Sequence, residues 1–342
     1  MKRPYKILMT GGTGFLGQVV QEICHEDFEI DVISRSSRAD VSGDLTKWNG
    51  GLNFEELSAK NYDAFVHLAG LYDLKAPRDE VLLNNVTGTG TALKIASLLK
   101  IPVFLNASSI AAATNLSGPE IDPYEVNFSR RFHDPYAESK ALAEQQIANW
   151  LGPLRVKINL RLGILVGDSV NGKISRIDGP YHTPEIFSRL RKLIESWKLP
   201  LPVPGNRDVH LPLVPVDKAA EAIMNITKWA LENKDLFGYK SFHIVPKRGL
   251  PIEDLYVSTL RHLKIHHSRL VLVRHIPEII ATKISQYALG FPEEQLRYAL
   301  HLPKYNSEAT RQVLGEHWCP EFTEYENSFW SGYEKYLSHR RN

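Results

Sequence analysis

The 342-residue sequence predicts an α/β fold, with a doubly wound parallel sheet and a smaller mixed C-terminal lobe. Three observations support this prediction. A glycine-rich turn, TGGTGFLG, follows a short apolar run near the N-terminus. Strand-like and helix-like segments then alternate as far as residue 168, and beyond it prolines cluster between Pro200 and Pro215. Strands that alternate with helices imply parallel pairing through right-handed crossovers.

The individual elements follow from local patterns along the chain. Apolar runs predict strands at 5–11, 28–34, 61–70, 102–109 and 156–167. Helical periodicity predicts helices at 14–26, 85–99 and 136–150, and the second ends before the pair Ile101–Pro102. In the C-terminal lobe we expect helices near 184–197, 217–232, 276–288 and 320–338.

The composition argues against several classes of protein. With 43% hydrophobic and 23% charged residues, the chain is typical of a globular domain, and 41 basic against 39 acidic residues make no electrostatic case for nucleic acid. The two cysteines, Cys24 and Cys319, lack CxxC spacing, so we expect neither a disulfide framework nor a metal site. No apolar run approaches the roughly 18 residues of a membrane span, and no signal peptide is evident. We therefore expect a cytoplasmic protein without stable membrane insertion.

The glycine turn is the first candidate binding feature. Gly11 would permit a tight turn, Gly14 would let the backbone approach a pyrophosphate, and Gly17 would let the helix pack closely on the strand. The free N–H groups at the start of the helix would then face the phosphates of a dinucleotide. A glycine turn without a ligand is the alternative. The expected contacts are Thr10, Gly11, Gly12, Thr13, Gly14, Phe15, Leu16 and Gly17.

A second constellation lies in YAESK, which places Tyr136 and Lys140 one helical turn apart on the same face. Upstream, Ser109 ends a predicted strand. A phenol, an ammonium and a hydroxyl can together move a proton onto or off a carbinol oxygen. Because free tyrosine titrates near pH 10, a base that works at neutrality needs a pKa lowered by about three units. A nearby Lys140 ammonium, helped by a cationic nicotinamide, favours this shift. A chance pairing on a helix surface is the alternative.

Taken together, these motifs resemble the extended short-chain dehydrogenase/reductase family. The resemblance is carried by TGGTGFLG, HLAG at 67–70, NVTGT at 85–89, ASS before Ile110, YAESK, RLGILVGD from residue 161 and LPLVPVDKAAEAI from residue 211. It implies a Rossmann-type fold, NAD(P)-dependent oxidoreductase activity and catalytic positions at Ser109, Tyr136 and Lys140. Ser108 is the alternative to Ser109, because the serine strand here continues as SSIAAATN instead of into a Tyr-Gly pair. The further cofactor contacts that it implies are Leu68, Ala69, Gly70, Asn85, Tyr136, Lys140, Leu162, Gly163 and Ile164.

The end of the second strand indicates which dinucleotide binds. An NAD site wants an acidic residue there, but Asp31 comes too early and Arg35 occupies the informative place, followed by Arg38. Since a guanidinium suits a ribose 2′-phosphate, we predict NADP, with NAD as the alternative. Asp44 and Leu45 resemble the family's pair beside the adenine. The predicted division is an NADP-binding Rossmann domain at 1–168, with later returns from about 208–245, and a mainly substrate-binding lobe at 169–342.

The substrate is indicated only by resemblance. The segments 167–183 and 289–315 resemble the polyketide- and lipid-associated subgroup, which includes thioester-reductase-like and fatty-acyl-reductase-like proteins. This resemblance implies hydride transfer to or from a carbonyl or alcohol of a hydrophobic acyl, polyketide or lipid-like substrate, small or carrier-linked. A nucleotide-sugar epimerase or dehydratase is one alternative, although Ile110 and Ala111 replace the acidic pair of the dehydratases. A non-catalytic NADP-sensing module is another. Homodimers through helices 85–99 and 136–150 are usual in the family.

Overall fold

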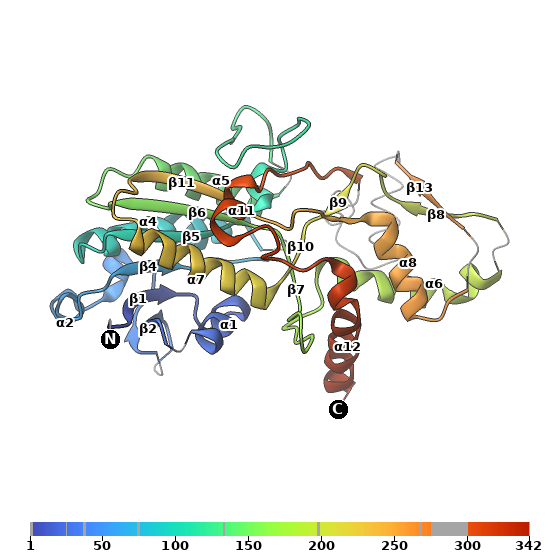
Figure 1. The fold of residues 1–342 in the computed structure, drawn as a ribbon, viewed down its shortest axis with the longest axis horizontal. Coiled ribbons are helices and arrows are strands. Elements are labelled where there is room, and N and C mark those ends of the chain that lie inside the picture. Colours follow the sequence, from blue (N-terminus) through green and yellow to red (C-terminus); the bar gives the residue numbers. More distant parts are fainter. Residues whose placement is uncertain are drawn as a thin grey trace.

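The computed structural model describes residues 3–341 except 25, 37–38, 74–75, 133, 197–198, 267–268 and 275–299. Seven parallel strands form its main sheet, in the order β11-β6-β5-β4-β1-β2-β3 (Figure 1). Their bounds are β1 Tyr5–Thr10, β2 Phe28–Ser34, β3 Val41–Ser42, β4 Ala64–His67, β5 Val103–Ser109, β6 Val156–Leu162 and β11 Gly238–Ile244. This order is that of a Rossmann fold, so the predicted fold class is confirmed. The expected helix at 276–288 lies outside the described residues.

Helices cover both faces of this sheet. They are α1 Phe15–Ile23, α2 Phe54–Ala59, α3 Arg78–Leu82, α4 Gly88–Leu98, α5 Pro135–Ala148 and α7 Val216–Glu232. Successive strand residues enter different cores: Ile7 and Met9 pack with α1 and α7, whereas Leu8 packs with α4 and α5. Because both faces are covered, the strands are apolar throughout, which explains their continuous hydrophobic runs. A π-helical turn at Leu83–Thr87 joins α3 to α4 in one helical run.

The lobe lies beside the carboxyl ends of the strands and has its own aromatic core (Figure 1). Tyr181 stacks on Phe329 of the C-terminal helix, with ring centroids 4.2 Å apart. Its elements are β7 Ile164–Val166, α6 Thr183–Ser196, β8 Leu201–Pro204, β9 His210–Leu211, β10 Leu213–Pro215, β12 Leu250–Pro251, α8 Ile252–His262, β13 Leu270–Val273 and α12 Phe322–Arg341. The helix α11 Glu308–Leu314 instead packs on α7 and β11 of the sheet half. Within the described ranges, no helix is long and apolar enough to cross a membrane.

One predicted strand is wrong in its extent. Residues 156–167 were expected to form a single strand, but the sheet ends at Leu162 and the chain turns away at Gly163. A Cβ at Gly163 would lie 2.5 Å from the carbonyl oxygen of Pro212, so two backbones cross closely there. The Ile164 N–H then donates to that same carbonyl, and β7 pairs with β10 instead of with the main sheet. This break directs the chain from the sheet into the lobe.

Candidate functional site

A cleft of about 620 Å³ lies at the carboxyl ends of the central strands, between the sheet and the lobe. The strand order reverses between β1 and β4 at this edge, where open α/β sheets bind ligands. The predicted site residues that line the cleft are Gly11, Gly14, Phe15, Leu16, Gly17, Leu68, Gly70, Ser109, Tyr136, Lys140, Leu162, Gly163 and Ile164. Those outside its wall are Thr10, Gly12, Thr13, Arg35, Asp44, Leu45, Ala69 and Asn85.

The glycine turn forms one end of the cleft. Gly11 has φ of +77°, a conformation that L side chains rarely adopt, and a Cβ there would meet the Ala69 nitrogen at 2.6 Å. At Gly17 a Cβ would lie 2.2 Å from the Gly11 carbonyl oxygen, so the helix packs directly on the turn. A Cβ at Gly14 would have only the Gly11 carbonyl oxygen within 4 Å, at 3.3 Å. No side chain in the described part of the chain caps α1 at Gly14, which leaves the first N–H groups of the helix available for an anion.

The start of α5 places the predicted tyrosine and lysine. Asp134 caps this helix by accepting a hydrogen bond of 2.8 Å from the Ala137 N–H, and Pro135 occupies its first turn. Tyr136 therefore lies in the first turn and Lys140 in the next one. The Lys140 ammonium donates to the Ala107 carbonyl at 2.9 Å and lies 5.8 Å from the centre of the Tyr136 ring.

The structure separates the two serines at the end of β5. The side chains of Ser109 and Tyr136 are hydrogen-bonded, and the Ser109 hydroxyl also accepts from the Ala111 N–H at 3.1 Å. The Ser108 hydroxyl instead donates to Glu144 at 2.5 Å and is 3% exposed. Neighbouring side chains on a strand point to opposite faces of the sheet. Because the Ser108 side chain points to the buried Glu144 carboxylate, the Ser109 side chain points the other way, to Tyr136. The geometry therefore favours Ser109 over Ser108.

The expectation that Lys140, helped by a cationic nicotinamide, would bring the pKa of Tyr136 down stays a prediction, and in the protein alone burial dominates. Burial, the largest cause, raises the pKa of Tyr136 to about 12, and the hydrogen bond with Ser109 acts in the opposite direction. Burial also lowers the pKa of Lys140 to about 8, while the Glu144 carboxylate acts in the opposite direction. The phenol of Tyr136 is therefore protonated near neutral pH, in the state of a proton donor.

A buried ion pair between Arg161 and Glu144 packs next to these residues, and it was not predicted from the sequence. Arg161 on β6 donates to Glu144 on α5 through Nη2 at 2.7 Å and through Nε at 3.0 and 3.1 Å. The two side chains are 0% and 1% exposed. Glu144 lies one turn after Lys140, so a YxxxKxxxE spacing is the signal that was available. The pair links α5 to β6, and the Ser108 hydroxyl donates to the same carboxylate.

Asn85 acts as a clamp within the protein. Its amide oxygen accepts from the Leu71 N–H at 2.6 Å, and its amide nitrogen donates to the Leu71 carbonyl at 3.0 Å and to the Ser139 hydroxyl at 2.8 Å. These three hydrogen bonds all go to groups of the protein, and they connect the segment after β4 to α5. Asn85 thus shapes the wall of the cleft from behind.

The region after β2 bears on the choice of dinucleotide. Asp31 is engaged in the fold, because it accepts from the Lys60 ammonium at 2.8 Å and from the Tyr62 hydroxyl at 2.5 Å. Arg35 follows β2 directly and is exposed, whereas Arg38 lies outside the described residues. The Asp44 side chain accepts from the backbone and hydroxyl of Thr46, so it closes a local turn.

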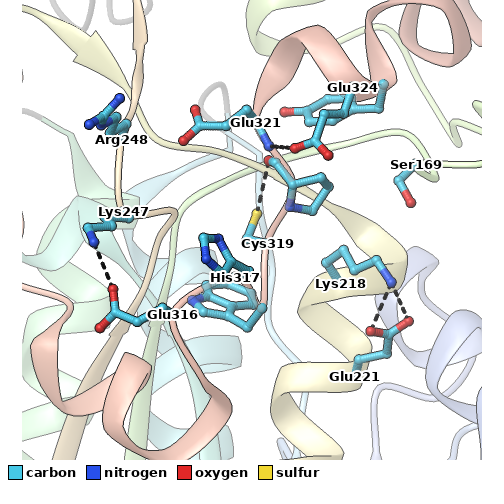
Figure 2. A pocket seen from close by; sticks show the side chains of 13 residues that line it. Ser169, Lys218, Glu221, Lys247, Arg248, Glu316, His317, Cys319, Glu321 and Glu324 are labelled. Carbon is cyan, nitrogen blue, oxygen red and sulfur yellow. Dashed lines mark hydrogen bonds and ion pairs between the residues drawn. The ribbon is translucent and has the colours of Figure 1, made fainter.

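A second cleft, of about 850 Å³, lies between the start of α7, the β11–β12 connection and the segment before α12 (Figure 2). Its lysines are paired with carboxylates, Lys247 with Glu316 at 2.8 Å and Lys218 with Glu221 at 2.7 Å. Burial, the largest cause, raises the pKa of the Cys319 thiol to about 12, so this thiol is not a nucleophile at neutral pH. Although this cleft is larger, its lining includes none of the predicted site residues. We therefore place the candidate site in the first cleft.

Comparisons with known proteins show the family of this chain. A family model described as male sterility protein matches residues 21–223, more than half of the chain. The nonribosomal peptide synthetase asaC of Aspergillus flavus is 28% identical over 232 residues, which are 64% of this chain and 21% of the synthetase. The chain therefore spans only a small part of that relative's length.

Solved structures share the whole fold. The terminal R domain from the myxalamid PKS-NRPS biosynthetic pathway is 21% identical, with 99% of this chain and 92% of that chain covered and a TM-score of 0.72. The UDP-Glc/GlcNAc 4-epimerase from Campylobacter jejuni is 16% identical, with 98% and 99% covered and a TM-score of 0.64. The resemblance stated from the motifs is confirmed: the chain belongs to the male sterility protein family, within the extended short-chain dehydrogenases/reductases, which are NAD(P)-dependent enzymes of oxidoreductase type.

Proposed function

We propose that the protein is an NADP-dependent oxidoreductase that transfers hydride to or from a carbonyl or alcohol of a hydrophobic acyl, polyketide or lipid-like substrate. The observation that carries this proposal is the joint placement of Ser109, Tyr136 and Lys140 on one wall of the cleft that begins at the glycine turn. Residues 1–168, with returns at about 208–245, would form the NADP-binding domain, and 169–342 mainly the substrate lobe. Homodimerisation through 85–99 and 136–150 belongs to the same proposal.

The site residues suit carbonyl reduction. A bound dinucleotide would supply the hydride to the carbonyl carbon. Ser109 would hold the carbonyl oxygen by a hydrogen bond, and the protonated Tyr136 would donate its proton to that oxygen as the carbon–oxygen double bond becomes single. Lys140, an ammonium beside the ring, would stabilise the phenolate left behind. In the opposite direction the same phenolate would accept the proton of an alcohol.

The dinucleotide would bind at the glycine turn. The uncapped N–H groups of α1 and the open space at Gly14 fit a pyrophosphate, which would lie between Gly11 and Gly17. Arg35, exposed after β2, fits a 2′-phosphate.

The NADP preference is tested with Arg35→Ala. We expect kcat/KM for NADPH to fall roughly tenfold to a hundredfold, the value of one charge-assisted contact, with NADH little changed. Arg207→Ala, which removes another exposed guanidinium, is the matched control. A wild-type preference for NADH would refute the NADP assignment.

The rest of the cleft supports a hydrophobic substrate. Aliphatic side chains from the lobe line it, namely Ile164, Ile174, Leu211, Ile252 and Leu255. These aliphatic side chains suit an acyl or polyketide chain, and the lobe's Arg176 in the cleft is already engaged with Asp178 and the Tyr72 carbonyl. The similarity to a nonribosomal peptide synthetase and to a PKS-NRPS terminal R domain supports a carrier-linked substrate.

The direct test uses purified protein, NADPH and three probes: decanal, 2-decanone and decanoyl-N-acetylcysteamine thioester. We expect NADPH consumption with at least one probe, and mass spectrometry of the product separates ketone from thioester reduction. Tyr136→Phe should abolish turnover and leave NADPH affinity nearly unchanged, whereas Tyr124→Phe, which alters an exposed phenol, should behave as wild type. Substantial turnover by Tyr136→Phe would rule out the assigned proton donor. Stoichiometric NADPH binding without turnover of any probe would favour a sensing module.

A further inference from the structure

A second tyrosine packs against the proposed proton donor. Tyr72 follows β4, and its ring meets the Tyr136 ring edge-to-face, with centroids 4.8 Å apart and an angle of 67° between the planes. Both rings line the cleft. Asn85 holds the chain immediately before Tyr72, because it accepts from the Leu71 N–H and donates to the Leu71 carbonyl. The sheet half of the molecule therefore places an aromatic ring directly beside Tyr136.

Two oppositely charged side chains of the lobe, Arg176 and Asp178, contact Tyr72. The Arg176 guanidinium lies 4.5 Å from the centre of the Tyr72 ring, and its Nη1 donates to the Tyr72 carbonyl at 3.3 Å. Its Nη2 pairs with Asp178 at 3.3 Å, and the Asp178 side chain is also hydrogen-bonded to the Tyr72 hydroxyl. Asp178 is fixed in turn, since it accepts from the Gly179 N–H at 2.8 Å at the start of a short 3₁₀ helix, Gly179–His182. Tyr72 thus connects the lobe to Tyr136.

We propose that Tyr72, Arg176 and Asp178 are positioning residues of the site, which orient Tyr136 and set the charges around its hydroxyl. The inference rests on the proposed function for its catalytic meaning. Edge-to-face packing favours one orientation of the Tyr136 ring. The two charges sit on a segment of the lobe, and their contacts with Tyr72 hold them beside the Tyr136 ring.

The groups that face Tyr136 define its electrostatics. They are Ser109 at the end of β5, Asp134 and Lys140 of α5 and its cap, Tyr72 after β4, and Arg176 and Asp178 of the lobe. Arg176 favours the phenolate of Tyr136, whereas Asp178 favours the neutral phenol. Removing one charge of the pair should therefore shift the ionisation of Tyr136 in one direction, and removing the other should shift it in the opposite direction.

The experiment follows Tyr136 itself. In protein labelled with ¹³Cζ-tyrosine, the Tyr136 resonance is assigned by its loss in Tyr136→Phe, and its shift is followed as the pH rises from neutral. We expect ionisation to begin at lower pH in Asp178→Asn and at higher pH in Arg176→Met, each by about half a pH unit or more, the effect of a unit charge a few ångströms away. Tyr72→Leu should move the resonance at neutral pH, and Tyr72→Phe, which keeps the ring, should leave it in place.

Kinetics with decanal and NADPH provide the second readout. Tyr72→Leu should lower kcat roughly tenfold or more with NADPH affinity unchanged, because a misplaced donor affects the chemical step. Tyr72→Phe should retain most of the wild-type kcat. Tyr124→Leu is the matched control, since it removes an edge-to-face partner of Tyr239, at 5.9 Å, outside the cleft.

The outcomes separate this inference from the proposed function. The inference is overturned, even in an active reductase, if Tyr136 ionises at the same pH in both charge variants as in the wild type. It is also overturned if Tyr72→Leu leaves the Tyr136 resonance in place. If the resonance responds as expected but no carbonyl probe is reduced, the positioning role of Tyr72, Arg176 and Asp178 stands and the proposed function fails.

Discussion

Replacing Glu144 with Gln tests the buried ion pair behind the candidate site. Glu144→Gln keeps the size of the side chain and removes its charge, so the Arg161 guanidinium would be left without a counterion at 0% exposure. Three contacts from Arg161 and one from the Ser108 hydroxyl converge on this carboxylate. All three side chains are buried, so water does not replace the lost carboxylate.

The magnitude follows from burial. Removing one partner of a buried ion pair leaves an uncompensated charge, which typically costs 3–5 kcal/mol. The free energy of unfolding should therefore fall by about 3–5 kcal/mol, a large part of the stability of an ordinary domain. The Glu144 carboxylate also favours the Lys140 ammonium, so its loss should lower the pKa of Lys140 from about 8 and move any alkaline loss of activity to lower pH.

Urea unfolding at neutral pH measures the effect on stability. The matched control is Glu138→Gln on the same helix, which also removes a carboxylate bound by two nitrogens of one arginine, at 2.6 and 2.8 Å. That pair is solvent-exposed, at 53% and 27%, so the midpoint should hardly move. Equal and small losses in the two variants would refute the argument. Combining Glu144→Gln with Arg161→Met should recover part of the stability, because no unpaired charge remains.

The other predictions concern acid stability and the glycine turn. Burial lowers the pKa of His67 to about 3. The imidazole of the unfolded chain takes up a proton near pH 6.5, whereas the buried native ring does not. The free energy of unfolding therefore falls as the pH drops below about 6.5. Urea unfolding at two pH values should show His67→Asn losing about 2 kcal/mol less stability than the wild type between pH 7 and pH 5, and equal losses would contradict this. Gly17→Ala would place a Cβ 2.2 Å from backbone, so we expect a loss of about 1–3 kcal/mol in thermal unfolding and of NADPH binding measured by fluorescence. Gly118→Ala, whose Cβ would meet nothing closer than 3.8 Å, is its control, and similar behaviour of the two variants would count against the close packing at Gly17.

Local pattern and motif predicted the sheet half of the molecule well. The strands at 28–34 and 102–109 match β2 and β5 within one residue, because buried parallel strands are continuous apolar runs bounded by polar or small residues. The extent of β6 was wrong, since the turn at Gly163 depends on the carbonyl of Pro212, about fifty positions further along the chain. No local pattern carries that contact.

The sequence by itself determined the family, the Rossmann-type sheet, the glycine turn and the helix that places Tyr136 one turn before Lys140, because each depends on residues close together in the chain. The tertiary structure decided which serine faces Tyr136, how Glu144 and Arg161 pair, and that Tyr72, Arg176 and Asp178 meet beside the phenol. These contacts join segments far apart in sequence, and the pKa of Tyr136 rises because of burial, which is a property of the packed fold.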